Sequence, residues 1–289
     1  MHPMRKAAWR RRVAALAGMM SALSAMAAEP AAAPAGMVEQ ACAPLPPKPA
    51  PTLEFERAFL ELGKPDLPRL LALTREPAHI AWQEAKKARD AQDWAGLCRY
   101  REDNAALLAA GRKPAIVFYG DSITENWVAG DPDLFGPGVI GRGISGQTSA
   151  QMLVRFHADV VSLQPQAVHI MAGTNDVAGN NGPTTEQAWR DNIMAMVEIA
   201  RAHGIRVVLG SIPPAARFIW RPELRPAAQI VRLNAWLRDY ARSQGLRYLD
   251  YHTAMAGADG GMKPAYSIDG VHPNREGYAA MRVLATSAR

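Results

Sequence analysis

From residue 115 onward, the chain alternates short apolar runs with longer amphipathic segments. The runs cover 115–119, 138–140, 167–172, 206–212 and 247–251. Apolar residues recur at helical spacing in the segments 147–163, 184–203, 226–244 and 274–288. Continuous apolar strands that alternate with helices are typical of a parallel sheet covered on both faces. We therefore predict a three-layer α/β/α domain over 111–289, with a mainly parallel five-stranded sheet and right-handed crossovers.

The first 110 residues follow other patterns. Residues 29–52 are rich in Ala and Pro, which favours an arm without regular structure. Residues 53–110 carry apolar side chains at helical spacing and predict a helical extension packed on the main domain. We identify no chemistry in this extension.

The N-terminus has the pattern of an export signal. A basic stretch, 1–12, precedes an uncharged stretch, 13–28, that ends in small residues. The uncharged stretch is shorter than the roughly 20 apolar residues of a membrane span, which disfavours a retained anchor. We predict a signal peptide over 1–28, a periplasmic or secreted location, and no integral membrane span in the mature chain.

Charge and composition indicate a soluble globular protein. The 289 residues are 48% hydrophobic and carry a formal charge of +6. Five of the basic residues lie in the first twelve positions, and without residues 1–28 the chain has 28 basic and 27 acidic side chains. Because the excess belongs to the leader, we expect no nucleic-acid partner.

Two cysteines, Cys42 and Cys98, would meet an oxidising compartment after export. Their pairing would stabilise the fold by about 3–4 kcal/mol, and two unrelated thiols are the alternative. Neither cysteine has further Cys or His nearby at zinc-ligand spacing. We predict neither a metal nor another cofactor.

Polar, glycine-containing loops follow the predicted strands. They cover 120–124, 143–147, 173–176 and 269–273. Ligands of open parallel sheets bind beyond the carboxyl ends of the strands, so these loops are the candidate site. Ester hydrolysis by a serine needs a hydroxyl, a base and donors for the developing oxyanion.

The four loops together resemble the sequence blocks of the SGNH (GDSL-type) family of serine esterases and lipases. Residues 120–122 match the nucleophile block, Gly146 the glycine block, 173–176 the asparagine block, and Asp269 with His272 the last block. The resemblance extends from about residue 115 to the C-terminus. It implies the flavodoxin-like fold of that family, and an oxyanion hole formed by the N–H groups of Ser122 and Gly146 and by the Asn175 amide.

Ser122 is the candidate nucleophile, His272 the base, and Asp269 the carboxylate that orients the imidazole. A helix N-cap is the alternative role for Ser122. His252, close to Asp250 after the fifth predicted strand, is the rival base, but the mobile polar loop of His272 suits a base better. Asp121 and Asp176 are expected to brace their loops, and His169, His157 and His203 to have no catalytic role.

The segment 141–146 also satisfies the pattern G-x-G-x-x-G of dinucleotide sites. Such a site needs an acidic residue at the end of the next strand, and that position holds apolar and small residues. We therefore disfavour a nucleotide-dependent enzyme.

We expect an esterase that acts through an acyl-serine on small acyl esters, acetyl esters first, including those of carbohydrates. Trp127, Phe218 and Trp220 are the candidate substrate-lining residues. Lysophospholipids and acyl thioesters are alternative substrates, and a non-catalytic ligand-binding protein with the same fold is the alternative of another class. The sequence leaves the oligomeric state open.

Overall fold

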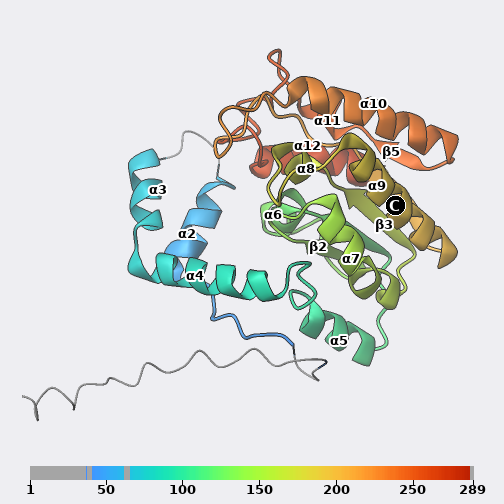
Figure 1. Ribbon diagram of the computed structural model, residues 1–289, viewed down its shortest axis with the longest axis horizontal. Coiled ribbons are helices and arrows are strands. Elements are labelled where there is room, and N and C mark those ends of the chain that lie inside the picture. Colours follow the sequence, from blue (N-terminus) through green and yellow to red (C-terminus); the bar gives the residue numbers. More distant parts are fainter. Residues whose placement is uncertain (1–36, 38–40, 62–65, 287–289) are drawn as a thin grey trace, which may run out of the picture. The chain divides into compact units, whose positions relative to one another are not determined.

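Five short strands form one parallel sheet (Figure 1). The computed structural model describes residues 37, 41–61 and 66–286. Its strand order is β2-β1-β3-β4-β5, and every neighbouring pair is parallel. The strands are β1 (Ile116–Gly120), β2 (Val139–Gly143), β3 (Ala167–Met171), β4 (Arg206–Gly210) and β5 (Arg247–Leu249).

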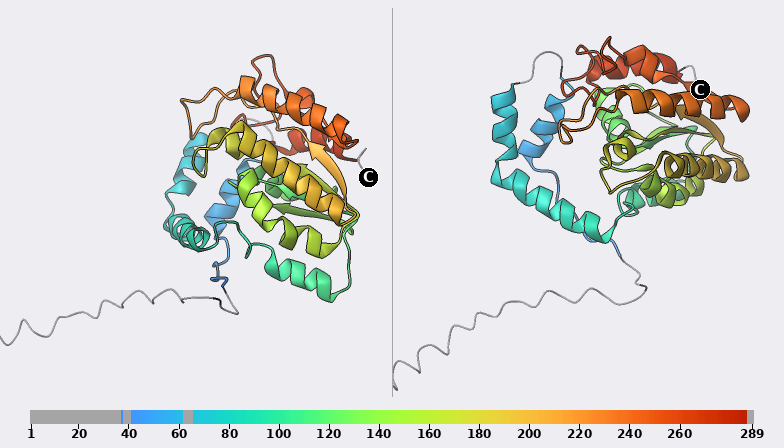
Figure 2. Two further views of the ribbon diagram at one scale, coloured as in Figure 1. Left: turned by 45° about the vertical axis from the view of Figure 1, so that its right-hand side comes forward. Right: turned by 45° about the horizontal axis from the view of Figure 1, so that its top comes forward.

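Helices cover both faces of this sheet (Figures 1 and 2). Side chains of β1 alternate between two apolar cores, because successive residues of a strand point to opposite faces. The first core contains side chains of α7 (Ser149–Asp159), α9 (Glu186–Ala202) and α10 (Ala227–Ser243). The second contains those of α6 (Ser122–Gly130), α11 (Tyr251–Met255) and α12 (Arg275–Thr286). The predicted three-layer α/β/α fold is confirmed.

Some elements end earlier than their apolar runs suggest. The fourth strand stops at Gly210 and the fifth at Leu249, where Asp250 accepts a hydrogen bond of 2.9 Å from the Thr253 N–H and starts α11. The segment 147–163 divides into α7 and a 3₁₀ turn, η1 (Val161–Leu163). A short helix, α8 (Thr174–Ala178), follows β3. Local capping by Asp250 therefore outweighs apolar content at the end of β5.

Before the sheet lie four helices: α2 (Ala50–Ala58), α3 (Leu67–Thr74), α4 (Pro77–Gln92) and α5 (Arg101–Ala109). Helix α2 begins inside the segment predicted as an irregular arm, because proline is tolerated in the first turn of a helix. Residues 94–100, where helical spacing suggested a helix, form turns instead. The predicted signal peptide, 1–28, lies outside the described residues.

The helical segment packs on the sheet domain, and the two belong to one compact unit that begins at Cys42. Leu60 is buried in the second apolar core. A disulfide joins Cys42 to Cys98, with a Cα–Cα distance of 5.5 Å. The Trp82 indole donates a hydrogen bond of 3.0 Å to the Pro46 carbonyl. The chain ahead of α2 is thus attached to both α4 and the turns before α5.

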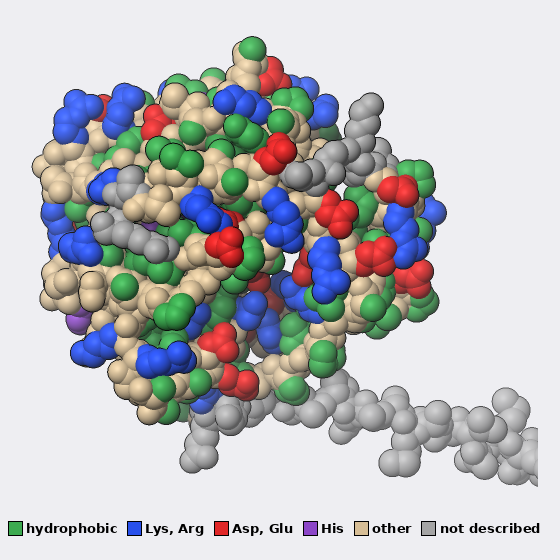
Figure 3. Space-filling view, turned by 180° about the vertical axis from the view of Figure 1, so that it is seen from behind, with side chains coloured by type: hydrophobic (Ala, Val, Ile, Leu, Met, Phe, Trp, Pro, Cys, Tyr) green, Lys and Arg blue, Asp and Glu red, His purple; other side chains and the backbone are tan. Residues whose placement is uncertain are grey.

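Within the described ranges, no helix combines the length and the apolar character that crossing a membrane requires. On the face shown in Figure 3, basic and acidic side chains are interspersed.

A buried arginine connects the strands that carry the site loops. Arg155 of α7 is fully buried, and its guanidinium donates to the Gly120 and Arg142 carbonyls, each at 2.9 Å. It also donates to the Gln147 side chain at 2.5 Å and pairs with Asp159 at 2.9 Å. Its donors therefore hold the ends of β1 and β2 and the loop after β2 in one arrangement.

Replacing Arg155 by Met should lower the free energy of unfolding by about 3–5 kcal/mol, because the buried Asp159 carboxylate loses its cation. Urea unfolding of both proteins measures this difference. Arg238→Met is the matched control, since Arg238 lies half-exposed on α10, 3.8 Å from Asp239, and should change stability by about 0.5 kcal/mol or less. Equal stability of the two variants would contradict the role assigned to Arg155.

Candidate active site

Ser122 stands at the turn from β1 into α6. Asp121, not Ser122, is the N-cap of this helix, because its carboxylate accepts a hydrogen bond of 3.0 Å from the Ile123 N–H. The N-cap interpretation of Ser122 is therefore wrong. Gly120 has no side chain where a Cβ atom would lie only 2.7 Å from the Met171 carbonyl oxygen, so this tight turn requires glycine.

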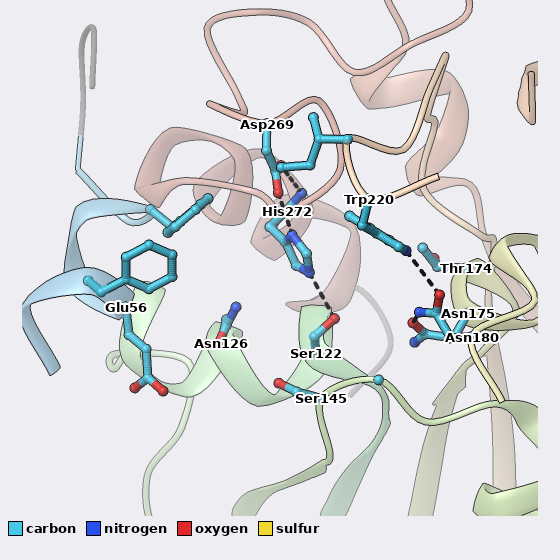
Figure 4. Close-up of a pocket in the computed structure, with 14 residues that line it drawn as sticks. Glu56, Ser122, Asn126, Ser145, Thr174, Asn175, Asn180, Trp220, Asp269 and His272 are labelled. Atoms are coloured by element: carbon cyan, nitrogen blue, oxygen red, sulfur yellow. Dashed lines mark hydrogen bonds and ion pairs between the residues drawn. The ribbon is translucent and has the colours of Figure 1, made fainter. Parts of the chain in front are cut away.

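His272 and Asp269 come from the loop between α11 and α12 and meet Ser122 (Figure 4). The Ser122 Oγ lies 2.9 Å from His272 Nε2, and His272 Nδ1 lies 2.7 Å from Asp269 Oδ2. The other oxygen of Asp269 accepts hydrogen bonds from the backbone N–H groups of Val271 and His272, at 2.9 and 2.8 Å. The carboxylate thus holds both the loop and the imidazole.

The charges of this group depend on one another. Burial by itself lowers the pKa of His272, but the hydrogen bond and the charge of Asp269 outweigh it, and with Asp121 they raise that pKa above its ordinary value. Burial raises the pKa of Asp269, yet the hydrogen bond from His272 and its backbone N–H partners hold that pKa below its usual range. Asp269 is therefore ionised at neutral pH.

The rival base lies elsewhere. His252 is on α11, its backbone N–H donates to Ser211 Oγ at 2.8 Å, and it does not line the cavity at Ser122. Asp250 caps α11 and makes no hydrogen bond to His252. His169 is fully buried beside the Tyr251 hydroxyl, at 3.0 Å, and burial lowers its pKa to about 3.

The predicted oxyanion donors lie beside Ser122. Gly146 has a φ of +82°, a conformation that favours glycine, and its N–H has no acceptor among the described residues. The Asn175 amide donates to the Gln147 carbonyl at 3.0 Å and to Asp121 at 3.2 Å. Gly146 and Asn175 both line the cavity at Ser122.

Two buried aspartates support these loops. Asp176 accepts hydrogen bonds from the N–H and the hydroxyl of Ser149, at the start of α7. Burial raises the pKa of Asp121 to about 6, against the opposing effects of the Ile123 N–H and the charge of His272. Asp121 accepts hydrogen bonds from the Ile123 N–H and from the Asn175 amide, and it therefore connects the turn of Ser122 to Asn175.

The turns before α5 brace the loop that carries Gly146. The Tyr100 hydroxyl donates to the Gly143 carbonyl at 2.5 Å, and the Gln147 amide donates to the Ala95 carbonyl at 2.7 Å. Glu125 accepts hydrogen bonds from the N–H and the hydroxyl of Ser145. It also forms an ion pair with Arg99, at 3.1 Å. The helical segment, in which sequence reasoning found no chemistry, therefore contacts the site directly.

A cavity of about 490 Å³ opens in front of Ser122. Trp220 lines it, as predicted, whereas Trp127 and Phe218 do not. Both are fully buried: Trp127 packs in the second core between Phe118 and Tyr278, and Phe218 lies behind Trp220, with 5.2 Å between ring centroids. Their assignment as substrate-lining residues is corrected on this ground.

Several lining residues were missed. They are Phe55, Glu56, Phe59, Asn126, Ser145, Thr174, Asn180 and Ile219. Thr174 and Ser145 lie in the loops that the sequence already singled out. Phe55, Glu56 and Phe59 gave no local signal, because an apolar pattern at helical spacing does not indicate which distant loops the helix will lie beside.

The segment 141–146 has a structural role in place of a nucleotide site. Gly141 and Gly143 belong to β2. A Cβ atom at Gly143 would lie 2.6 Å from the Asp121 carbonyl oxygen, so α6 packs directly against this strand. Close packing accounts for Gly141 and Gly143, and the positive φ accounts for Gly146.

The hydrogen bonds that join Ser122, His272 and Asp269 at the carboxyl edge of the sheet form an arrangement typical of serine hydrolases. Residues 118–280 match the family model of the GDSL-like Lipase/Acylhydrolase family. The chain belongs to this family, whose members hydrolyse esters, and the resemblance found in the sequence is confirmed.

Two solved structures are similar over most of their length. One, assigned to the acylhydrolases, is from Bacteroides fragilis NCTC 9343: it is 46% identical, with a TM-score of 0.64, over 68% of this chain and 96% of that one. The other, a GDSL-like lipase from Bacteroides thetaiotaomicron VPI-5482, is 44% identical, with a TM-score of 0.63, over 67% and 97%.

An uncharacterized lipoprotein of Bacillus subtilis (strain 168) is 34% identical over 79 residues. The match covers 26% of this chain and 32% of the lipoprotein. The chain thus spans about a third of the length of this curated relative.

Asp269→Asn should shift the acidic limb of the pH–rate profile to lower pH. A base must be neutral, so activity falls as pH drops through the pKa of His272, which Asp269 raises. Without the carboxylate, burial lowers that pKa, and kcat should fall by about 10⁴ because the imidazole tautomer is no longer fixed.

The measurement is kcat/KM for an aryl acetate between pH 4 and 9. Asp250→Asn is the matched control, because Asp250 neighbours the rival His252, and it should leave the limb in place. If the acidic limb moves in Asp250→Asn and stays in place in Asp269→Asn, the base is His252 instead.

Proposed function

We propose that this chain is a serine ester hydrolase that works through an acyl-serine intermediate on small acyl esters, acetyl esters first, including those of carbohydrates. The supporting observation is that His272 contacts both the Asp269 carboxylate and the Ser122 hydroxyl, and that Ser122 lines a cavity. Membership of an ester-hydrolysing family supports the same reaction.

In the first half-reaction, His272 Nε2 takes the proton of Ser122 and the serine oxygen attacks the acyl carbon. The carbonyl oxygen becomes an oxyanion, for which the N–H groups of Ser122 and Gly146 and the Asn175 amide are the proposed donors. To bind it, the Asn175 amide must release one present acceptor, and the bond to Asp121 is the longer one, 3.2 Å against 3.0 Å.

Collapse of the tetrahedral intermediate breaks the bond between the acyl carbon and the alcohol oxygen, and His272 gives its proton to the departing alcohol. In the second half-reaction His272 takes a proton from water, whose oxygen attacks the acyl-serine. Return of the proton to Ser122 releases the carboxylic acid. The raised pKa of His272 suits both roles, because a group that acts as base and then as acid works best when its pKa is close to the operating pH.

Ser122→Ala should lower kcat for p-nitrophenyl acetate by about 10⁶, because the covalent route is lost while the cavity remains. A fluorophosphonate probe should label the wild-type protein at Ser122 and leave the variant unlabelled. Ser162→Ala, which removes a serine hydroxyl far from the site in η1, is the matched control and should keep both properties. Equal hydrolysis by wild type and Ser122→Ala would refute the proposal. A wild-type protein that neither hydrolyses the ester nor reacts with the probe would favour a non-catalytic binding protein.

We also propose that the protein works outside the cytoplasm, as a periplasmic or secreted enzyme. The Cys42–Cys98 disulfide supports this, because such bonds persist in oxidising compartments, and so does the likeness to a lipoprotein. After expression with its leader, intact-mass analysis of the exported protein should give a chain that begins near Glu29. A full-length chain confined to the cytoplasm would contradict the proposal.

A further inference from the structure

Helix α2 supplies one wall of the cavity at Ser122, although it lies outside the region, 118–280, that the family shares. In Figure 4, Glu56 of α2 stands on one side of Ser122, and Trp220, Thr174 and Asn180 stand on the other. An ester bound at Ser122 therefore has α2 beside one part of it. The chain carries a wall that its family does not require.

The surface that α2 and its C-cap residue, Phe59, present to the cavity is mainly aromatic. Phe55 and Phe59 line the cavity, with 5.1 Å between their ring centroids and their planes at 61°. On the opposite side, the Trp220 ring lies 6.2 Å from the His272 ring. Aromatic side chains thus flank the reacting serine on two sides, and aromatic rings favour stacked or edge-to-face contacts with other rings.

The wall is held in place by contacts to the catalytic domain. Leu60, two residues beyond α2, is buried in the second core, and its carbonyl accepts a hydrogen bond of 3.2 Å from the Arg275 N–H, three residues after His272. Near the other end of α2, the Thr52 hydroxyl lies 3.0 Å from His79 of α4. Glu56, later in the helix, pairs with Lys48 at 2.7 Å. Phe55 and Phe59 lie between Thr52 and Leu60 in the chain.

The cavity has room for more than an acetyl group. A closed cavity of about 150 Å³ is large enough for benzene, so about 490 Å³ holds an acetyl group and a ring together. Between Glu56 and Ser122 in Figure 4, Asn126 lines the cavity, and no hydrogen bond is drawn from its amide to another lining residue. Asn126 can therefore bind a hydroxyl or ether oxygen of a substrate.

We propose that Phe55 and Phe59 form a substrate-binding wall for the flat apolar face of a ring carried by one half of the ester, either an aryl group or a sugar. The proposal rests on the proposed esterase function and adds the substrate class to it. It assigns the N-terminal helical segment a role in specificity.

The test is a comparison of kcat/KM for four acetates: ethyl, hexyl and benzyl acetate and an acetylated methyl xyloside. Phe55→Ala and Phe59→Ala should each lower the ratio of at least one ring ester to ethyl acetate by about tenfold, and the hexyl to ethyl ratio by about threefold or less. The ring ester that loses more distinguishes an aryl from a sugar substrate.

Leu53→Ala is the matched control, because Leu53 lies on the same helix, exposed and away from the cavity, and it should keep all ratios. Phe59→Leu, which keeps apolar volume, serves where an alanine variant unfolds, and should lower the same ratio by about threefold. Ratios that stay within twofold of wild type in the phenylalanine variants, or an equal fall for hexyl acetate, would overturn the proposal. If Ser122→Ala loses activity but the phenylalanine variants keep the wild-type ratios, this inference alone is overturned. Activity that does not depend on Ser122 would overturn the proposed function itself.

Discussion

The buried guanidinium of Arg155 is the interaction on which the geometry of the site depends. It donates to the carbonyl of Gly120, directly before Asp121 and Ser122, and to the Gln147 side chain in the loop that carries Gly146. A charge without access to water must have its donors satisfied, so Arg155 tolerates little displacement of either partner. The nucleophile and a predicted oxyanion donor, which come from different strands, thereby share one rigid support.

The N-terminal helical segment extends this support to the outer side of the loop after β2. Tyr100 and Ala95 bind Gly143 and Gln147, and Arg99 pairs with Glu125 on α6. The Cys42–Cys98 disulfide fixes the turns that make these contacts. A segment that sequence reasoning treated as an appendage is thus part of the scaffold of the site, and through α2 it also borders the cavity.

Two buried aspartates near His272 differ because their partners differ. Asp269 accepts hydrogen bonds from the His272 imidazole and from two backbone N–H groups, and these outweigh burial and keep its pKa low. Asp121 has fewer such partners, so burial dominates and raises its pKa to about 6. The first suits an orienting anion for the imidazole, and the second suits a structural group that caps α6 and holds Asn175.

The sequence by itself determined the parallel sheet and the loops that hold Ser122, Gly146, Asn175, Asp269 and His272. These follow from local patterns: apolar runs select buried strands, and parallel strands place their following loops at one edge. The burial of Trp127 and Phe218 and the position of Phe55 and Phe59 depended on tertiary structure. A local pattern records that a side chain is apolar, whereas only packing between distant segments decides whether it fills the core or faces a substrate.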